Sequence, residues 1–301
     1  MLGRVQRLAR DAKTRLHDQS DLRLARHTVE TAYPAINALF VRIIRKTGVR
    51  PPYLWGALHG GYLAKALGIA AVSLIEFGVA GGNGLIDLDQ IGQALEAYLG
   101  IQAVVYGFDT GRGLPAPVDT RDCPNLFSGG DYPMDVERLR ARLQSAEVVL
   151  GDVADTIEPF LASHPAPVAF ISFDLDLYSA TNQALRLLEG DPEALLPRVH
   201  CYFDDISGFT YAEFNGERLA MREFNERNGP RKISPIYSLA HYVPTRCARD
   251  LWVEKMHLAH ILDHPLYGRP DGLTRVARKD LHGAAPSAAA WRWHHGAREP
   301  D

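Results

Sequence analysis

The chain has 301 residues, of which 46% are hydrophobic and 23% charged, as in an ordinary soluble globular protein. Its formal net charge of -3 argues against a nucleic-acid-binding protein, because such proteins usually carry a basic stripe. No run approaches the ~18 consecutive apolar residues of a membrane span, and three scattered cysteines match neither a disulfide framework nor a metal site, so the sequence predicts reduced thiols in a cytoplasmic protein.

The first part of the chain is predicted to be helical. Apolar residues recur at spacings of three and four up to Gly48, which ends the segment before a Pro-Pro pair. A further helical stretch follows over 54–67 and contains the sequence "HGGY" at 59–62. Its glycine pair suggests a mobile segment that folds over a ligand, whereas ordinary packing of His59 is the interpretation we prefer. Residues 1–64 are therefore predicted to form an N-terminal helical extension.

From residue 65 the pattern changes to short apolar strands that alternate with helices. Near-continuous apolar strands in such an alternation predict an α/β fold with a parallel sheet covered by helices on both faces. We assign 65–260 to this domain and expect 261–301 to be a partly disordered extension. Two late runs, over 232–243 and 251–261, are candidates to close the sheet with an antiparallel edge. The predicted strands are 71–77, 103–109, 147–152, 167–174 and 200–205, and the predicted helices are 88–99, 135–144, 154–162, 181–189 and 217–228.

The first strand ends in the glycine-rich stretch "EFGVAGGNG". Its glycines do not have the spacing of a dinucleotide-binding fingerprint, and Glu76 lies where a pyrophosphate would be repelled. A carboxylate at this strand end suits a cationic ligand. We therefore expect Gly78, Gly82 and Gly84 to allow a close approach to a ligand, with Glu76 facing its positive group.

The second strand ends at Asp109, where a carboxylate can accept hydrogen bonds from two ribose hydroxyls. Together with the glycine loop, this residue indicates a nucleoside ligand with a positive centre. S-adenosylmethionine, a sulfonium attached to an adenosine, fits that description. The alternative is that Asp109 caps a turn, which the glycines form. The third strand ends near Asp152 and Val153, which we expect to contact the adenine.

Aspartates follow the fourth and fifth strands, at Asp174, Asp176, Asp204 and Asp205. If these strands are neighbours, about 4.8 Å separates them, so their ends can share one ion. Converging carboxylates repel one another without a cation, and Mg²⁺ prefers such oxygen ligands. We assign Asp174, Asp204 and Asp205 to a metal site and Asp176 to a catalytic base. The alternative is that the aspartates cap the helices that follow.

These segments resemble the macrocin (TylF-type) O-methyltransferases, which are metal-dependent sugar O-methyltransferases of the class I S-adenosylmethionine-dependent group. The resemblance covers about residues 70 to 245, and the order and spacing of its motifs are specific. The segments that carry it are "EFGVAGGNG" at 76–84, "GFDTGRGLP" at 107–115, "GDVADTI" at 151–157, "DLDLYSAT" at 174–181 and "FDDISG" at 203–208.

The resemblance implies a Rossmann-like, seven-stranded methyltransferase sheet with S-adenosylmethionine as the methyl donor. It also implies Mg²⁺ held by Asp174, Asp204 and Asp205, and a base at Asp176. The expected acceptor is a small molecule, a sugar or another polyhydroxylated natural product. Two alternatives stay open, which are a metal-independent or N-directed methyltransferase and a nucleotide-binding protein without catalysis. Whether the chain forms a homo-oligomer is also open.

Overall fold

Strands and helices alternate from residue 71 to residue 203, as the apolar runs predict. The computed structural model describes residues 30–31, 33–270 and 274–275. The strands are β1 (Glu30–Thr31), β2 (Ala71–Phe77), β3 (Gln102–Asp109), β4 (Glu147–Leu150), β5 (Val168–Phe173), β6 (Leu195–Phe203), β7 (Arg231–Pro235), β8 (Met256–Ile261) and β9 (Thr274–Arg275). The α-helices are α2 (Tyr33–Thr47), α3 (Pro51–Leu67), α4 (Asn83–Leu99), α5 (Val136–Arg140), α6 (Val153–Ala162), α7 (Tyr178–Ala184), α8 (Gly216–Arg227) and α9 (Trp252–Lys255). Short 3₁₀ helices are η1 (Thr120–Asp122), η2 (Leu185–Glu189), η3 (Pro192–Ala194) and η4 (Leu239–His241).

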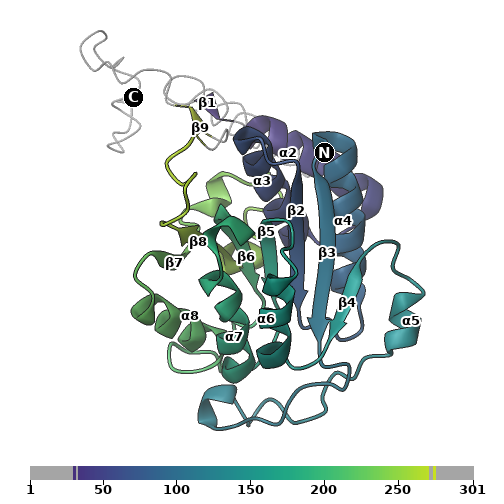
Figure 1. Cartoon of the computed structure of the whole chain (residues 1–301), viewed down its shortest axis with the longest axis vertical. Helices are drawn as coiled ribbons and strands as arrows, with labels where there is room; N and C mark the ends of the chain where they lie inside the picture. Colours follow the sequence, from purple (N-terminus) through teal and green to yellow (C-terminus); the bar gives the residue numbers. More distant parts are fainter. Residues whose placement is uncertain (1–29, 32, 271–273, 276–301) are drawn as a thin grey trace, which may run out of the picture. The chain divides into compact units, whose positions relative to one another are not determined.

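Seven strands form one sheet in the order β4-β3-β2-β5-β6-β8-β7 (Figure 1). The first five in this order pair in parallel, and β8 is antiparallel to both β6 and β7. This arrangement confirms the seven-stranded sheet that the resemblance implies. The chain winds from β2 outward to β4 and then returns to β5 on the other side of β2. Ligands of open α/β sheets bind beyond the carboxyl ends of the strands at such a switch point.

Helices cover both faces of this sheet, and each face has its own apolar core. Residues of α2, α3 and α4 pack on one face, and residues of α6, α7 and α8 pack on the other. Strand β5 is buried along its whole length because it lies between these two layers. Its sequence, "VAFISF", accordingly reads as a nearly continuous apolar run instead of alternating with polar residues.

The "HGGY" segment is part of the continuous helix α3, and its residues His59, Gly60 and Gly61 are buried, so the expectation of a mobile segment was wrong. A Cβ added at Gly60 would lie 2.9 Å from the backbone oxygen of Ala169, so the small residue allows α3 to lie directly on β5. His59 is buried in the same layer, where its ring stacks on Trp55 with ring centroids 3.8 Å apart. The packing interpretation of His59 is therefore the one that the structure supports.

Acidification is expected to destabilise the fold through His59. Burial lowers its pKa from 6.5 to about 4, because a charged imidazolium would lose its hydration there. A folded-state pKa below the unfolded value means that the stabilisation is complete above about pH 6.5 and is lost as the pH falls toward 4. Between neutral pH and pH 5 the unfolding free energy should fall by about 2 kcal/mol more in the unsubstituted chain than in His59→Gln.

Urea unfolding at the two pH values measures this difference. His241→Gln is the matched control, because His241 is exposed on η4 and its replacement should leave the pH dependence unchanged. An equal loss of stability in His59→Gln and in the unsubstituted chain would show that His59 does not cause it.

Several predicted elements have different limits in the structure. Helix α5 is shorter than the predicted helix over 135–144, and the run over 251–261 is divided between α9 and β8. One compact unit contains the whole seven-stranded sheet and α3, although α3 belongs to the segment 1–64 that we predicted as an extension. The predicted helical residues before 30 and most of the predicted tail over 261–301 lie outside the described residues. Strands β1 and β9 pair in a separate two-stranded sheet.

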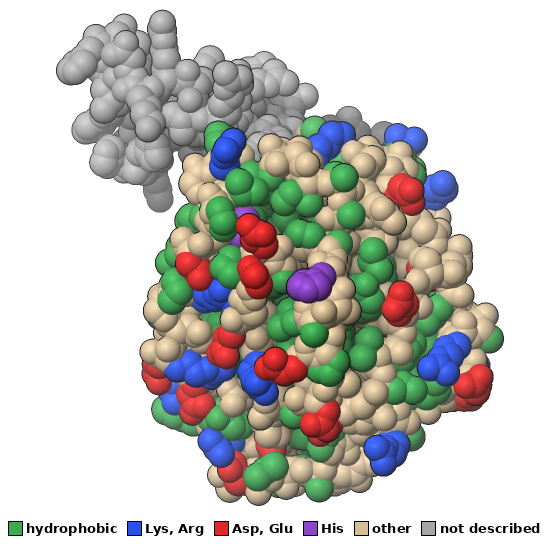
Figure 2. Space-filling model, viewed as in Figure 1, with side chains coloured by type: hydrophobic (Ala, Val, Ile, Leu, Met, Phe, Trp, Pro, Cys, Tyr) green, Lys and Arg blue, Asp and Glu red, His purple; other side chains and the backbone are tan. Residues whose placement is uncertain are grey.

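The described helices and the charges on one face of the molecule can be compared with the sequence predictions. None of these helices combines the length and the apolar character that crossing a membrane requires. On the face that Figure 2 shows, Lys and Arg side chains are interspersed with Asp and Glu and do not form a stripe.

Candidate functional site

A cavity of about 400 Å³ opens beyond the carboxyl ends of the strands, where the switch point lies. The loops that follow five successive strands, β2 to β6, contribute to its lining. All the predicted metal ligands and the predicted base line it, at Asp174, Asp176, Asp204 and Asp205. The residues predicted to bind the donor line it as well, which are Glu76, Gly78, Gly82, Gly84, Asp109, Asp152 and Val153.

The glycine loop between β2 and α4 is held tightly against other parts of the protein. Gly78 has a φ of +81°, and a Cβ there would lie 1.8 Å from the backbone oxygen of Asp174. A Cβ at Gly84 would lie 1.8 Å from Oε1 of Glu76, and one at Gly82 would lie 2.2 Å from Leu139. These glycines are therefore required by close contacts within the protein itself, in addition to any ligand.

Asp109 anchors the same loop. Its Oδ2 accepts hydrogen bonds from the backbone N–H groups of Val79 and Ala80, each at 2.9 Å, and its Oδ1 accepts one from Gly111 at 2.7 Å. A carboxylate has about four lone-pair sites, so about one remains for a ligand. The two ribose hydrogen bonds that the sequence suggested are more than this carboxylate has left, because the backbone already uses the others.

Asp152 has a comparable structural role at the end of β4. Its side chain caps α6 by accepting a hydrogen bond from the N–H of Ala154 at 2.9 Å. Val153, the first residue of α6, is buried and presents an apolar side chain to the same cavity. Asp152 and Val153 therefore line the cavity at the end of β4.

Glu76 is a buried acid at the inner end of the cavity. Its Oε1 accepts a hydrogen bond of 2.7 Å from the Tyr53 hydroxyl, which itself accepts one of 2.8 Å from Ser172. Its Oε2 is buried and has no hydrogen-bond partner among the described residues. Burial raises the pKa of Glu76 to about 8, because the carboxylate has lost its hydration. The ionised form would be stabilised by a ligand cation at Oε2.

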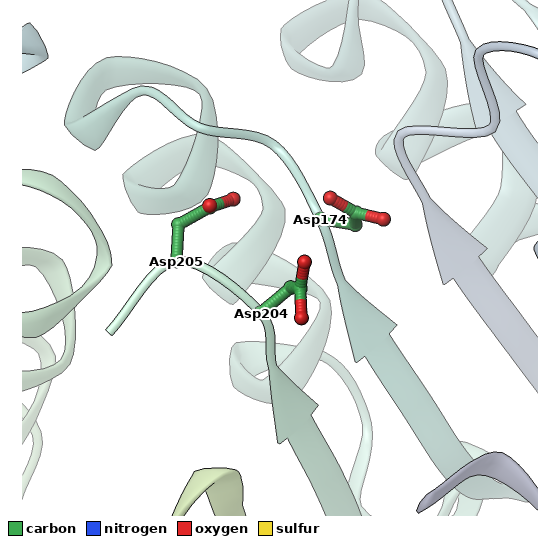
Figure 3. Close-up of side chains that lie close together, drawn as sticks. All are labelled: Asp174, Asp204 and Asp205. Atoms are coloured by element: carbon green, nitrogen blue, oxygen red, sulfur yellow. The ribbon is translucent and has the colours of Figure 1, made fainter. Parts of the chain in front are cut away.

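Three carboxyl groups converge where β5 and β6 end. These strands pair in parallel with Phe173 opposite Phe203, so the residues that follow each strand lie side by side. Figure 3 shows Asp174, Asp204 and Asp205 with their carboxyl groups turned toward a common space. One oxygen from each lies within 4.8 Å of the others.

The electrostatics of this cluster favour a cation. Burial, followed by the charges of Asp205 and Asp204, raises the pKa of Asp174 to about 7. Asp204 differs, because hydrogen bonds from Lys255 at 2.8 Å and Tyr202 at 2.6 Å outweigh its burial and lower its pKa. A divalent ion would relieve the repulsion among the three groups and stabilise their ionised forms.

Asp176 lies beside this cluster but is not one of its three members. Its φ of +61° is left-handed, which is uncommon for a residue with a side chain and is found preferentially at functional sites. Its backbone N–H donates to Oδ2 of Asp205 at 3.3 Å. Burial and then the charge of Asp205 raise the pKa of Asp176 to about 8, so its carboxylate is a stronger base than an ordinary one.

The structure adds residues that the motifs did not identify. Arg50 and Tyr132 line the cavity, and Tyr132 has a left-handed φ of +59°. Tyr211 donates a hydrogen bond to Asp205 at 3.0 Å, and Lys255 holds Asp204. The segments that carry the resemblance do not include Arg50, Tyr132 or Lys255. The only sequence feature next to one of them is the Pro-Pro pair after Arg50, which predicts a break in the chain.

Comparisons with known proteins give matches only among solved structures. No family model and no curated protein matches the chain. Similar structures include the calicheamicin methyltransferase CalS11, with 20% identity over 64% of this chain and 84% of that chain and a TM-score of 0.44. The O-methyltransferase NovP has 17% identity over 56% of this chain and 69% of that chain, with a TM-score of 0.43. The O-methyltransferase TomG from Streptomyces achromogenes, involved in tomaymycin synthesis, has 13% identity over 81% and 96%, with a TM-score of 0.36.

Proposed function

We propose that this chain is an S-adenosylmethionine-dependent O-methyltransferase that requires Mg²⁺ or a similar divalent cation. Its acceptor is a hydroxyl of a sugar or of another small polyhydroxylated natural product. The observation that carries this proposal is the presence of a buried acid near the end of β2, beside a glycine loop, and a cluster of three aspartates in one cavity. The first suits a nucleoside with a cationic group, and the second suits a hard metal ion that binds a substrate oxygen.

The donor fits the inner part of the cavity. The unpartnered Oε2 of Glu76 matches the ammonium of a methionine moiety, because a buried carboxylate oxygen without a hydrogen bond is costly until a cation binds it. Asp109 would contribute a single hydrogen bond to the ribose. Asp152 and Val153 would border the adenine, where Val153 offers an apolar surface.

The metal would bind in the part of the cavity that the three aspartates line. Asp174, Asp204 and Asp205 supply an all-oxygen donor set, which is the set that Mg²⁺ prefers. When bound, such an ion lowers the pKa of an acceptor hydroxyl. Tyr202 and Lys255 hold Asp204, and Tyr211 holds Asp205, so the ligands are oriented by their neighbours.

The residues of this chain then direct a displacement at carbon. Asp176 accepts the proton of the acceptor hydroxyl, and the oxygen attacks the methyl carbon of the donor. The C–O bond forms as the bond between carbon and sulfur breaks, and its electron pair stays on sulfur to give S-adenosylhomocysteine. Most of the acceleration comes from positioning, since the residues that line the cavity align the oxygen, the methyl group and the sulfur.

Calorimetry with S-adenosylhomocysteine tests the donor assignment. We expect binding to the unsubstituted chain, and the absence of binding would exclude a methyltransferase of either kind. Activity that is indifferent to EDTA would favour a metal-independent enzyme. Donor binding without transfer to any sugar or polyol would point to an N-directed enzyme or to a protein without catalysis.

Removing one metal ligand gives a separate test with a binding readout. Titration with Mg²⁺ should show at least about tenfold weaker binding to Asp174→Asn than to the unsubstituted chain, because the amide lacks the negative charge. Asp155→Asn, an exposed residue of α6, is the matched control and should bind Mg²⁺ normally. Equal affinity in all three proteins would contradict the metal site.

A further inference from the structure

The cavity contains a single basic residue. Among the described residues that line it, Arg50 is the only Lys, Arg or His, and the other charged residues there are all acidic. A lone guanidinium in an acidic cavity lowers the pKa of Glu76 and of Asp174, although burial dominates and keeps both raised. A cavity built only to bind cations would gain from losing this positive charge. Its positive charge would complement an anionic part of a ligand.

The guanidinium of Arg50 has hydrogen-bonding capacity that the protein does not use. Its Nη1 is buried and makes no hydrogen bond to the described residues. The carboxylate that it faces, Asp87, lies 3.9 Å from Nη1, which is beyond hydrogen-bond distance. Oδ2 of Asp87 already accepts the backbone N–H of Arg50 at 3.1 Å. A buried N–H group without a partner is costly, and an anionic ligand would supply the missing acceptor.

Arg50 is held in place by its backbone. It is the residue before Pro51 and Pro52, which begin α3, and the bond to Asp87 ties it to α4. The guanidinium also lies over the ring of Tyr53, 5.4 Å from its centroid. The group is thus positioned before any ligand arrives, which reduces the entropy lost on binding.

Arg50 and Glu76 lie beside each other at the same end of the cavity. A Cβ added at Gly84 would lie 2.7 Å from Nη1 of Arg50 and 1.8 Å from Oε1 of Glu76. The guanidinium of Arg50 and the carboxylate of Glu76 therefore lie close to the same position, and each has one atom without a hydrogen-bond partner among the described residues, Nη1 and Oε2. Opposite charges placed in this way are complementary to a zwitterion, and an α-amino acid presents an ammonium and a carboxylate on one carbon.

We propose that Arg50 binds the α-carboxylate of the methionine end of S-adenosylmethionine, next to the ammonium held by Glu76. This inference rests on the proposed function and adds a donor-specificity residue to it. It predicts that the site distinguishes S-adenosylmethionine from a decarboxylated analogue, which keeps the sulfonium and the amine. Two hydrogen bonds from a guanidinium to a carboxylate would account for about a 10- to 100-fold difference in affinity.

The test measures the binding of both ligands by calorimetry, with competition where binding is weak. Arg50→Gln should weaken S-adenosylmethionine binding about 10- to 100-fold and leave decarboxylated S-adenosylmethionine unaffected. Arg50→Lys should recover part of the loss because it keeps the charge. Arg112→Gln, an exposed residue of the loop after β3, is the matched control and should bind both ligands normally.

The possible results separate this inference from the proposed function. If the unsubstituted chain binds neither ligand, the proposed function is wrong, and the inference fails with it. If it binds S-adenosylmethionine and Arg50→Gln binds equally well, only the inference is wrong. An equal weakening for both ligands would also overturn it, because it would show that Arg50 maintains the cavity and does not contact the carboxylate. Thermal unfolding of each variant without ligand identifies a loss of folding.

Discussion

Replacing Asp176 by asparagine is expected to lower the turnover number by about 100- to 10,000-fold and to leave donor binding intact. The substitution removes the carboxylate that accepts the hydroxyl proton and keeps the size of the side chain. Asparagine also tolerates left-handed backbone conformations, so the φ of +61° at this position is preserved. The loss should therefore be one of chemistry and not of folding.

Two measurements check this expectation. Release of S-adenosylhomocysteine with an accepted sugar gives the turnover number, and calorimetry gives the affinity for the donor. Asp155→Asn on α6 serves as the matched control because its side chain is exposed. A fully active Asp176→Asn enzyme would eliminate Asp176 as the base. Loss of donor binding would instead assign Asp176 a role in maintaining the cavity.

The second large effect is expected from Gly78→Ala. The added Cβ would lie 1.8 Å from the backbone oxygen of Asp174 and 2.7 Å from its carbonyl carbon, and neither atom can rotate away. The φ of +81° adds strain for any residue with a Cβ. We expect the free energy of unfolding to fall by at least about 2 kcal/mol and the loop to shift away from Asp174.

Gly81 supplies a matched control within the same loop. A Cβ at Gly81 would meet nothing within 4 Å, so Gly81→Ala should change the stability little. Urea unfolding of the two variants measures the difference, and calorimetry with S-adenosylhomocysteine reports on the loop. Equal stability of Gly78→Ala and Gly81→Ala would mean that the contact between Gly78 and Asp174 is not needed by the fold.

The position of the site could be predicted because it depends on strand ends. Glu76 is the last residue but one of β2, Asp109 ends β3, and Asp174 and Asp204 directly follow β5 and β6. Parallel strands place their carboxyl ends at one edge of the sheet, so acids at the ends of neighbouring strands reach the same cavity. The pairing of β5 with β6, on which the aspartate cluster depends, is likewise confirmed.

The hydrogen bonds and packing contacts of individual residues could not be predicted in this way. Asp109 accepts two hydrogen bonds from the backbone of the glycine loop, and Gly82, with a φ of +82°, lies against the side chain of Leu139. These contacts join segments that are remote along the chain, whereas a local pattern records only neighbours in sequence. The "HGGY" segment shows the same limit, because Gly60 serves the packing of α3 on β5 and Gly61 serves its packing on α4.

By itself, therefore, the sequence determined the class of fold, the edge of the sheet where the cavity opens and the acids that line it. Apolar periodicity and acids at strand ends can be read from neighbouring residues. Once the apolar strands are buried in a sheet, these acids lie at its edge. The tertiary structure alone decided that Arg50, from the start of α3, and Lys255, from the end of α9, reach these acids. Their positions depend on how α3 packs on the sheet and on where β8 enters it, and no local pattern encodes either contact.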